Sequence, residues 1–136
     1  MAQTDIERLS SIARDRSQSE NARTTAIHAM GRLPADESIP QLIALMRDDS
    51  LSVRWTAATT LRKYGLAMLE PLLRALATQP ADRHFYESAH HALIRFGNPT
   101  IEAILAPVLG ALTQSGVAEA VPAAAMEALE KLQTVS

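Results

Sequence analysis

The chain has 136 residues, 47% hydrophobic and 21% charged, and is therefore expected to form a single globular domain. It contains no cysteine, which excludes disulfides, thiolate metal sites and cysteine nucleophiles, and a cytoplasmic location is the default expectation. The net charge of −2 argues against general nucleic-acid binding. The N-terminal segment lacks an apolar stretch, and the longest run of apolar residues and glycine, 103–112, is too short to span a bilayer, so neither a signal peptide nor a membrane span is expected.

One pattern of residues recurs four times along the chain. An alanine is followed four residues later by Met or Leu, and three residues after that by Leu, Tyr or Phe. The four alanines are Ala26, Ala57, Ala89 and Ala125. This recurrence predicts a single repeat domain of four two-helix units, at about residues 5–34, 36–65, 67–97 and 100–133.

The second unit shows how each unit is built. Its first helix carries apolar residues at the i, i+3, i+4 and i+7 positions of one face: Ile39, Leu42, Ile43 and Met46. A polar turn follows at 47–50, and the second helix repeats the pattern from Val53 to Tyr64. Gly65 is expected to form a left-handed helix cap. Residues suited to cap the start of the second helix recur in three units: Ser19, Ser50 and Asp82.

The second unit resembles a HEAT repeat, in the short form found in phycobilisome (bilin) lyases. The resemblance rests on Asp48-Asp49-Ser50-Leu51-Ser52-Val53-Arg54, then Ala57-Ala58, Leu61 and Tyr64-Gly65. It implies an all-α fold, a right-handed α-α superhelix (solenoid) of about four helical hairpins, with second helices on the concave side. It also implies that Arg54 reaches the turn acid, Asp48 or Asp49, as a structural contact, and that a partner binds the concave side.

Side chains two positions before and after each central alanine are expected to point away from the first helices. These two rows read Thr24, Trp55, Glu87, Ala123 and then His28, Thr59, His91, Glu127. A third row, near the helix ends, is cationic: Arg32, Lys63, Arg95 and Lys131. Two interpretations of the cations stay open, a site for an acidic partner segment or simple compensation of the helix dipoles.

Trp55 is the only tryptophan and also has two interpretations. It is either a binding anchor on the concave face or a wedge packed flat between neighbouring second helices. The histidines His84, His90 and His91 lack the i, i+4 spacing of a ligand pair, so no metal site is expected. Phosphate-binding loops and nucleophile motifs are missing, and no catalytic residue or cofactor is expected.

The leading hypothesis is a non-enzymatic scaffold for protein–protein interactions. The residues predicted to contact the partner are Trp55, Thr59, Glu87, His91, His28, Arg32, Lys63 and Arg95. A bilin lyase or lyase subunit is the alternative, in which Lys63, Arg95 and Glu87 contact a tetrapyrrole. A third, less favoured hypothesis is nucleic-acid binding through the cationic row.

The C-terminal unit has more small apolar residues than one buried face requires, from Val117 and Ala118 to Ala128. An end of a repeat array that is not capped by polar residues predicts either a homodimer through this unit or a longer parent protein.

Overall fold

The computed structural model describes residues 3–114 and 119–135, and within these ranges the chain is all-helical. The predicted all-α fold of helical hairpins is confirmed. No helix in the described ranges is long and apolar enough to cross a membrane. The described elements are α1 (Asp5–Arg14), α2 (Glu20–Met30), α3 (Ala35–Leu45), α4 (Leu51–Arg62), the short 3-10 helix η1 (Gly65–Met68), α5 (Leu69–Thr78), α6 (Arg83–Leu93), α7 (Pro99–Thr113) and α8 (Ala120–Thr134).

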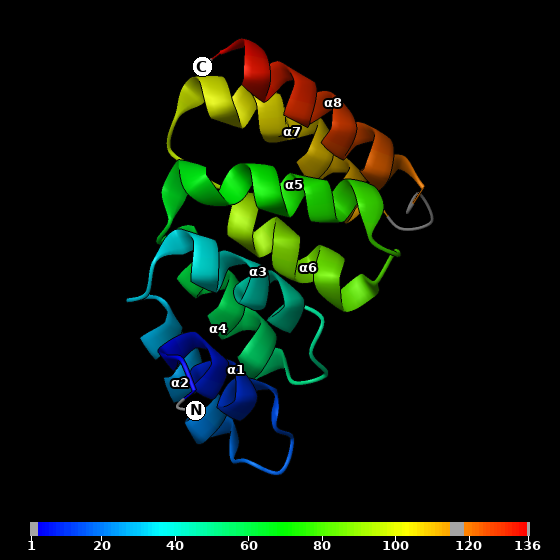
Figure 1. Cartoon of the computed structure of the whole chain (residues 1–136). Coiled ribbons are helices and arrows are strands. Elements are labelled where there is room, and N and C mark those ends of the chain that lie inside the picture. The colour runs from blue at the N-terminus through cyan, green and yellow to red at the C-terminus, as the bar shows by residue number, and fades with distance from the viewer. Residues whose placement is uncertain (1–2, 115–118, 136) are drawn as a thin grey trace.

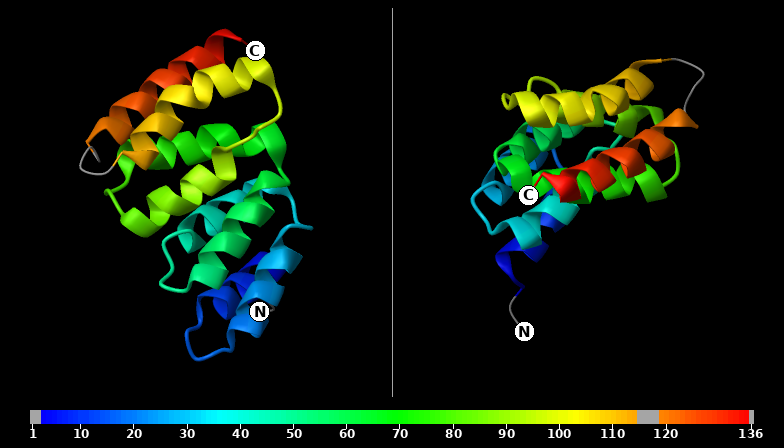
Figure 2. Two further views of the ribbon diagram at one scale, coloured as in Figure 1. Left: turned by 180° about the vertical axis from the view of Figure 1, so that it is seen from behind. Right: turned by 90° about the horizontal axis from the view of Figure 1, so that it is seen from above.

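The helices form two layers, which Figures 1 and 2 show from opposite sides. The first layer contains α1, α3 and α5, the first helices of the first three hairpins. The second layer contains α2, α4 and α6, in which α2 packs against α4 and α4 packs against α6. Each hairpin therefore stacks on the one before it, as expected for a repeat array.

The fourth hairpin joins this stack the other way round. α7 packs against α6, whereas α8 packs against α5 and α7, so α8 completes the first layer (Figure 2). The connection after α6 differs from the others, because Ile94 leaves the helix in an extended conformation and Arg95 and Gly97 have φ angles of 51° and 95°. It turns the chain back along α6 rather than across to α5. The prediction that the rows of second helices continue into the last helix is therefore wrong for Ala123, Glu127 and Lys131.

Helix caps form where the sequence predicts them. The side chains of three caps each accept a hydrogen bond from the backbone N–H three residues further on, at 3.0 Å for Ser19, 3.3 Å for Ser50 and 2.9 Å for Asp82. Gly65 has a φ of 58°, in the left-handed region predicted for it. These local contacts set the register of each second helix and thus decide which side chains face outward.

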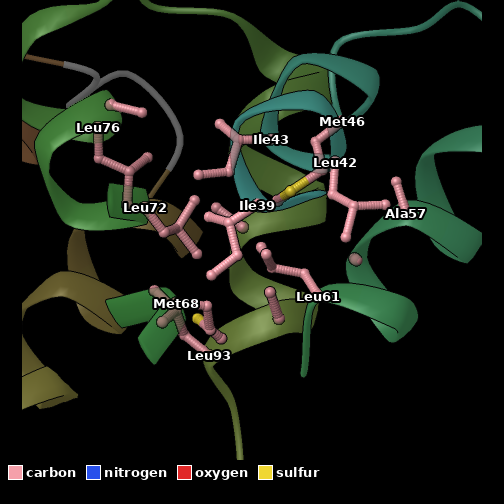
Figure 3. Packing of buried hydrophobic residues seen from close by; sticks show 14 of the residues in the cluster. Ile39, Leu42, Ile43, Met46, Ala57, Leu61, Met68, Leu72, Leu76 and Leu93 are labelled. Atoms are coloured by element: carbon pink, nitrogen blue, oxygen red, sulfur yellow. The ribbon is translucent and has the colours of Figure 1, made fainter. Parts of the chain in front are cut away.

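The hydrophobic core fills the space between the layers, and Figure 3 shows its middle part. Leu72 and Leu76 of α5 lie on one side of α3, and Ala57 and Leu61 of α4 lie on the other. The central alanines are all buried: Ala26, Ala57, Ala89 and Ala125. Their small side chains allow close helix crossings without loss of helix propensity.

The C-terminal unit buries its small side chains on two neighbours, because α8 contacts both α5 and α7. The buried residues of α8 are Val121, Ala125, Ala128 and Leu129. Ala123 and Met126 stay exposed, and Val117 and Ala118 lie outside the described residues. A homodimer through this unit stays a prediction, which sedimentation velocity tests.

Candidate functional site

The outward side chains of α2, α4 and α6 and of the residues that directly follow these helices form a surface that we call the second-helix face. The structure places all eight predicted contact residues on it. His91 is half-buried, and the others are exposed: Trp55, Thr59, Glu87, His28, Arg32, Lys63 and Arg95. Their role in binding a partner stays a prediction.

Trp55 and Thr59, one turn apart on α4, both contact His91 on α6. The rings of Trp55 and His91 stack, with their centroids 3.7 Å apart and an interplanar angle of 19°. The Oγ1 atom of Thr59 lies 3.1 Å from Nε2 of His91, within hydrogen-bond distance. Trp55 packs against the neighbouring second helix and still exposes 48% of its surface, so the structure combines both interpretations of this residue.

The environment of His91 favours the neutral form of its imidazole. Burial lowers the pKa of His91 below its ordinary value, and the charges of Arg62 and His90 lower this pKa further. A neutral imidazole has one donor and one acceptor nitrogen. Nε2 therefore accepts a hydrogen bond from the Thr59 hydroxyl in one tautomer and donates one to it in the other.

A groove of about 920 Å³ opens beside Trp55 on the second-helix face. Its walls are Trp55, the first two turns of α6 and the last turn of α7, from Ala111 to Gln114. The wall from α7 exists because the fourth hairpin is reversed. The repeat pattern carries no signal for this arrangement, so sequence reasoning missed the groove.

The charged side chains that line the groove already form contacts within the chain. Glu87 forms an ion pair with Arg83 at 3.2 Å, and Asp82 caps α6 and lies 3.9 Å from Arg47. The Tyr86 hydroxyl is different, since it is buried and has no hydrogen-bond partner among the described residues. Burial raises the pKa of Tyr86, so this hydroxyl keeps its proton beneath the surface of the groove wall.

Arg32, Lys63 and Arg95 lie together at the C-terminal ends of α2, α4 and α6, and we call them the cationic row. The ends of α2 and α4 are close, since Cδ of Lys63 lies 3.8 Å from where a Cβ on Gly31 would be, and Gly31 precedes Arg32. The ends of α4 and α6 are also close, since Arg62 donates to the carbonyl of Arg95 at 3.3 Å. None of the three cations forms an ion pair with another described residue. The fourth predicted member, Lys131, lies on α8 and is not part of the row.

Contacts from the end of α4 tie it to both neighbouring second helices. Arg62 donates through Nη1 to the carbonyls of His91, Ala92 and Ile94, at 2.9, 3.1 and 2.6 Å. The Tyr64 hydroxyl donates to the carbonyls of Met30 and Leu33, at 3.0 and 2.7 Å. Sequence reasoning missed Arg62, because the equivalent positions of the adjacent units hold Gly31 and Ile94 and so show no repeated cation.

The turn acids join the first two units. Arg54 reaches Asp48 and Asp49 through their main-chain oxygens, at 2.9 and 3.0 Å, rather than through the expected carboxylates. The Asp48 carboxylate instead binds Arg23 of the preceding unit at 2.5 Å, and Asp49 pairs with Arg16 at 2.9 Å. The turn acids therefore stabilise repeat stacking.

These features define the class of protein: an α-solenoid of stacked helical hairpins with one exposed layer of second helices. A family model described as HEAT repeats matches residues 6–93, more than half of the chain, and the chain belongs to the HEAT-repeat family. The match ends at the last residue of α6, before the reversed hairpin. No curated protein and no solved structure matches the chain. Within the described ranges, no group of three or more potential ligands is suited to hold a metal ion.

Proposed function

We propose that the chain is a non-enzymatic scaffold that binds a protein partner on the second-helix face, which the family resemblance implies to be concave. HEAT repeats generally act as protein-interaction scaffolds. The observation that carries the proposal is the half-exposed Trp55 at the rim of a groove, on the same face as three cations that form no ion pair with a described residue.

In this proposal Trp55 is the anchor of the interface. Tryptophan is enriched among the residues that dominate binding energy, and those residues lie beside pockets that a partner fills. The groove accepts an apolar partner side chain against the indole. The cationic row favours a partner segment that is acidic.

Photocrosslinking in cells tests the proposal. A photoreactive phenylalanine analogue replaces Thr59 or His28 on the second-helix face, and Arg74 on α5 in the control. A discrete crosslinked protein is expected from the two second-helix positions and not from Arg74. Adding Trp55→Ala should then abolish the crosslink from His28. Identical crosslinks from all three positions would contradict the proposed face.

A bilin lyase or lyase subunit stays as the second candidate, because the groove volume lies within the usual range of small-molecule sites. Of the three residues expected to contact a tetrapyrrole, Glu87 lines the groove, whereas Lys63 and Arg95 do not. Titrating the protein with a free bilin tests this candidate. An unchanged absorption spectrum would remove it.

A further inference from the structure

We propose that the partner segment is an extended chain with an acidic residue at every third position, which lies across the ends of α2, α4 and α6 on the cationic row. This inference rests on the proposed function and specifies the chemistry and spacing of the partner. Two observations carry it, the free charge of the row and the backbone conformation of Arg95, together with the usual spacing of packed helices.

The three cations of the row form no ion pair with a described residue, although Asp36 and Glu37 begin α3 four and five residues after Arg32. Two acidic residues that the repeat pattern places near it, Glu127 and Glu130, lie on α8 in the first layer instead. Glu87 shares α6 with the row but lies two turns away and is paired with Arg83. The three cations are exposed and have no acidic partner among the described residues. Their field therefore favours an anionic occupant.

The spacing of the row selects the form of that occupant. The cations lie on adjacent packed helices, whose axes are about 8–10 Å apart. An extended or polyproline II chain advances about 3.1–3.3 Å per residue, so three residues span one step of the row. Polyproline II also has about three residues per turn, which puts every third side chain on one side. Acidic residues at positions i, i+3 and i+6 therefore meet Arg32, Lys63 and Arg95 in turn.

Compensation of the helix dipoles does not explain Arg95. Its φ is 51°, in the left-handed region that glycine adopts freely and other residues adopt rarely. A cation in the last turn of α6, with ordinary backbone angles, would serve the dipole equally well. The left-handed backbone serves the turn into α7, where glycine would adopt the same conformation freely, and the long cationic side chain of Arg95 is not needed for that turn.

The test is an NMR titration of the isotope-labelled protein with synthetic peptides. The probe is made of three Glu-Pro-Pro triplets, and its isomer has the three glutamates in succession followed by the prolines. The triplet peptide is expected to bind about tenfold more tightly than the isomer, with shifts concentrated at the row. Added salt should weaken this binding. Equal affinity for the two peptides would overturn the proposed spacing.

Two triple variants with the same change in net charge locate the binding. Replacing Arg32, Lys63 and Arg95 by alanine should lower the affinity for the triplet peptide about tenfold. Replacing Arg8, Arg74 and Lys131, which are exposed on helices of the first layer, should leave it unchanged. Equal losses in both variants would overturn the proposal. The single variant Arg95→Gly relieves the left-handed strain, so it should keep the melting temperature and still weaken binding.

A DNA duplex serves as the competing ligand at the same salt concentration. Tighter binding of the duplex than of the triplet peptide, lost in the row variant, would overturn the proposal in favour of a nucleic acid. A failure of this inference can be distinguished from a failure of the proposed function. If the crosslinked partner needs Trp55 but binds the row variant normally, the scaffold function stands and the acidic spacing is wrong.

Discussion

Trp55 stacks on His91 of the neighbouring second helix, with ring centroids 3.7 Å apart and an interplanar angle of 19°. The contact joins α4 to α6 at the surface, directly beside the groove. Because Trp55 is the only tryptophan in the chain, its fluorescence reports on this contact without interference from other indoles.

Lowering the pH should quench Trp55 as His91 takes up a proton, because a protonated imidazole quenches indole fluorescence more strongly than a neutral one. Burial holds the pKa of His91 below its ordinary value, so the midpoint should lie below about 6.5. The unfolded chain binds the proton more readily. Stability should therefore be constant above about pH 6.5 and decrease as the pH falls towards the pKa of the folded state.

Fluorescence titration and urea unfolding at several pH values measure both effects. His91→Gln keeps a hydrogen-bonding side chain without the titration and should remove the low-pH quenching. A midpoint at or above about 6.5, or the same curve in the variant, would contradict this assignment.

Gly31→Ala should destabilise the contact between the end of α2 and α4. A Cβ at this position would lie 2.8 Å from Cγ2 of Thr60, which is buried and cannot move aside freely. Overpacking of this kind costs about 1–3 kcal/mol. Thr60→Ser removes the clashing methyl group and should recover part of the loss. Urea unfolding of the two single variants and the double variant measures the coupling, and strictly additive effects would show that the clash is not the cause.

Asp48→Ala should destabilise the fold far more than Asp49→Ala. The carboxylate of Asp48 binds Arg23, and the two side chains are only 10% and 6% exposed, so its removal leaves a buried guanidinium without its carboxylate and with only the Ala13 carbonyl as an acceptor, 2.8 Å from Nε. That loss costs about 3–5 kcal/mol. Asp49 pairs with Arg16 in solvent, and such pairs contribute less than about 1 kcal/mol. Chemical denaturation compares these adjacent aspartates, and equal losses would disprove the structural role of Asp48.

Arg62→Met should cost about 2 kcal/mol, because it removes charge-assisted hydrogen bonds to carbonyls at the end of α6. Arg74→Met is the matched control, since Arg74 forms an exposed ion pair with Glu70 one turn away on α5. The control should change stability by less than about 0.5 kcal/mol. Equal thermal stability of the two variants would contradict the role of Arg62 in joining α4 to α6.

Periodicity in the sequence predicts much of the fold and the outward rows of the first three units. The central alanines are buried, the capping residues bind the expected backbone groups, and Trp55 and Arg32 face outward, because spacing along a helix decides all of these. The same reasoning could not predict features that depend on one connection. The reversed fourth hairpin follows the left-handed backbone at Arg95, and an arginine gives no sign of that conformation.

The groove was beyond sequence reasoning for the same reason, because its second wall comes from α7 of the reversed hairpin. The contacts of Arg62 were missed because they reach a helix about thirty residues away and occur at one position of one unit. Long-range contacts of a single side chain leave no periodic trace in the sequence, whereas caps and buried faces do.

The claim that the partner binds the second-helix face is tested most directly by measuring the affinity of the purified crosslinked partner for two variants. Each variant changes one large apolar side chain of nearly equal exposure. Trp55 and Met126 are 48% and 49% exposed, on the second layer and the first layer respectively. Trp55→Ala is expected to lower the affinity about thirtyfold or more, as loss of an anchor does, whereas Met126→Ala should change it less than about twofold. Unchanged affinity in Trp55→Ala, with or without a loss in Met126→Ala, would contradict the claim that this scaffold binds through the second-helix face.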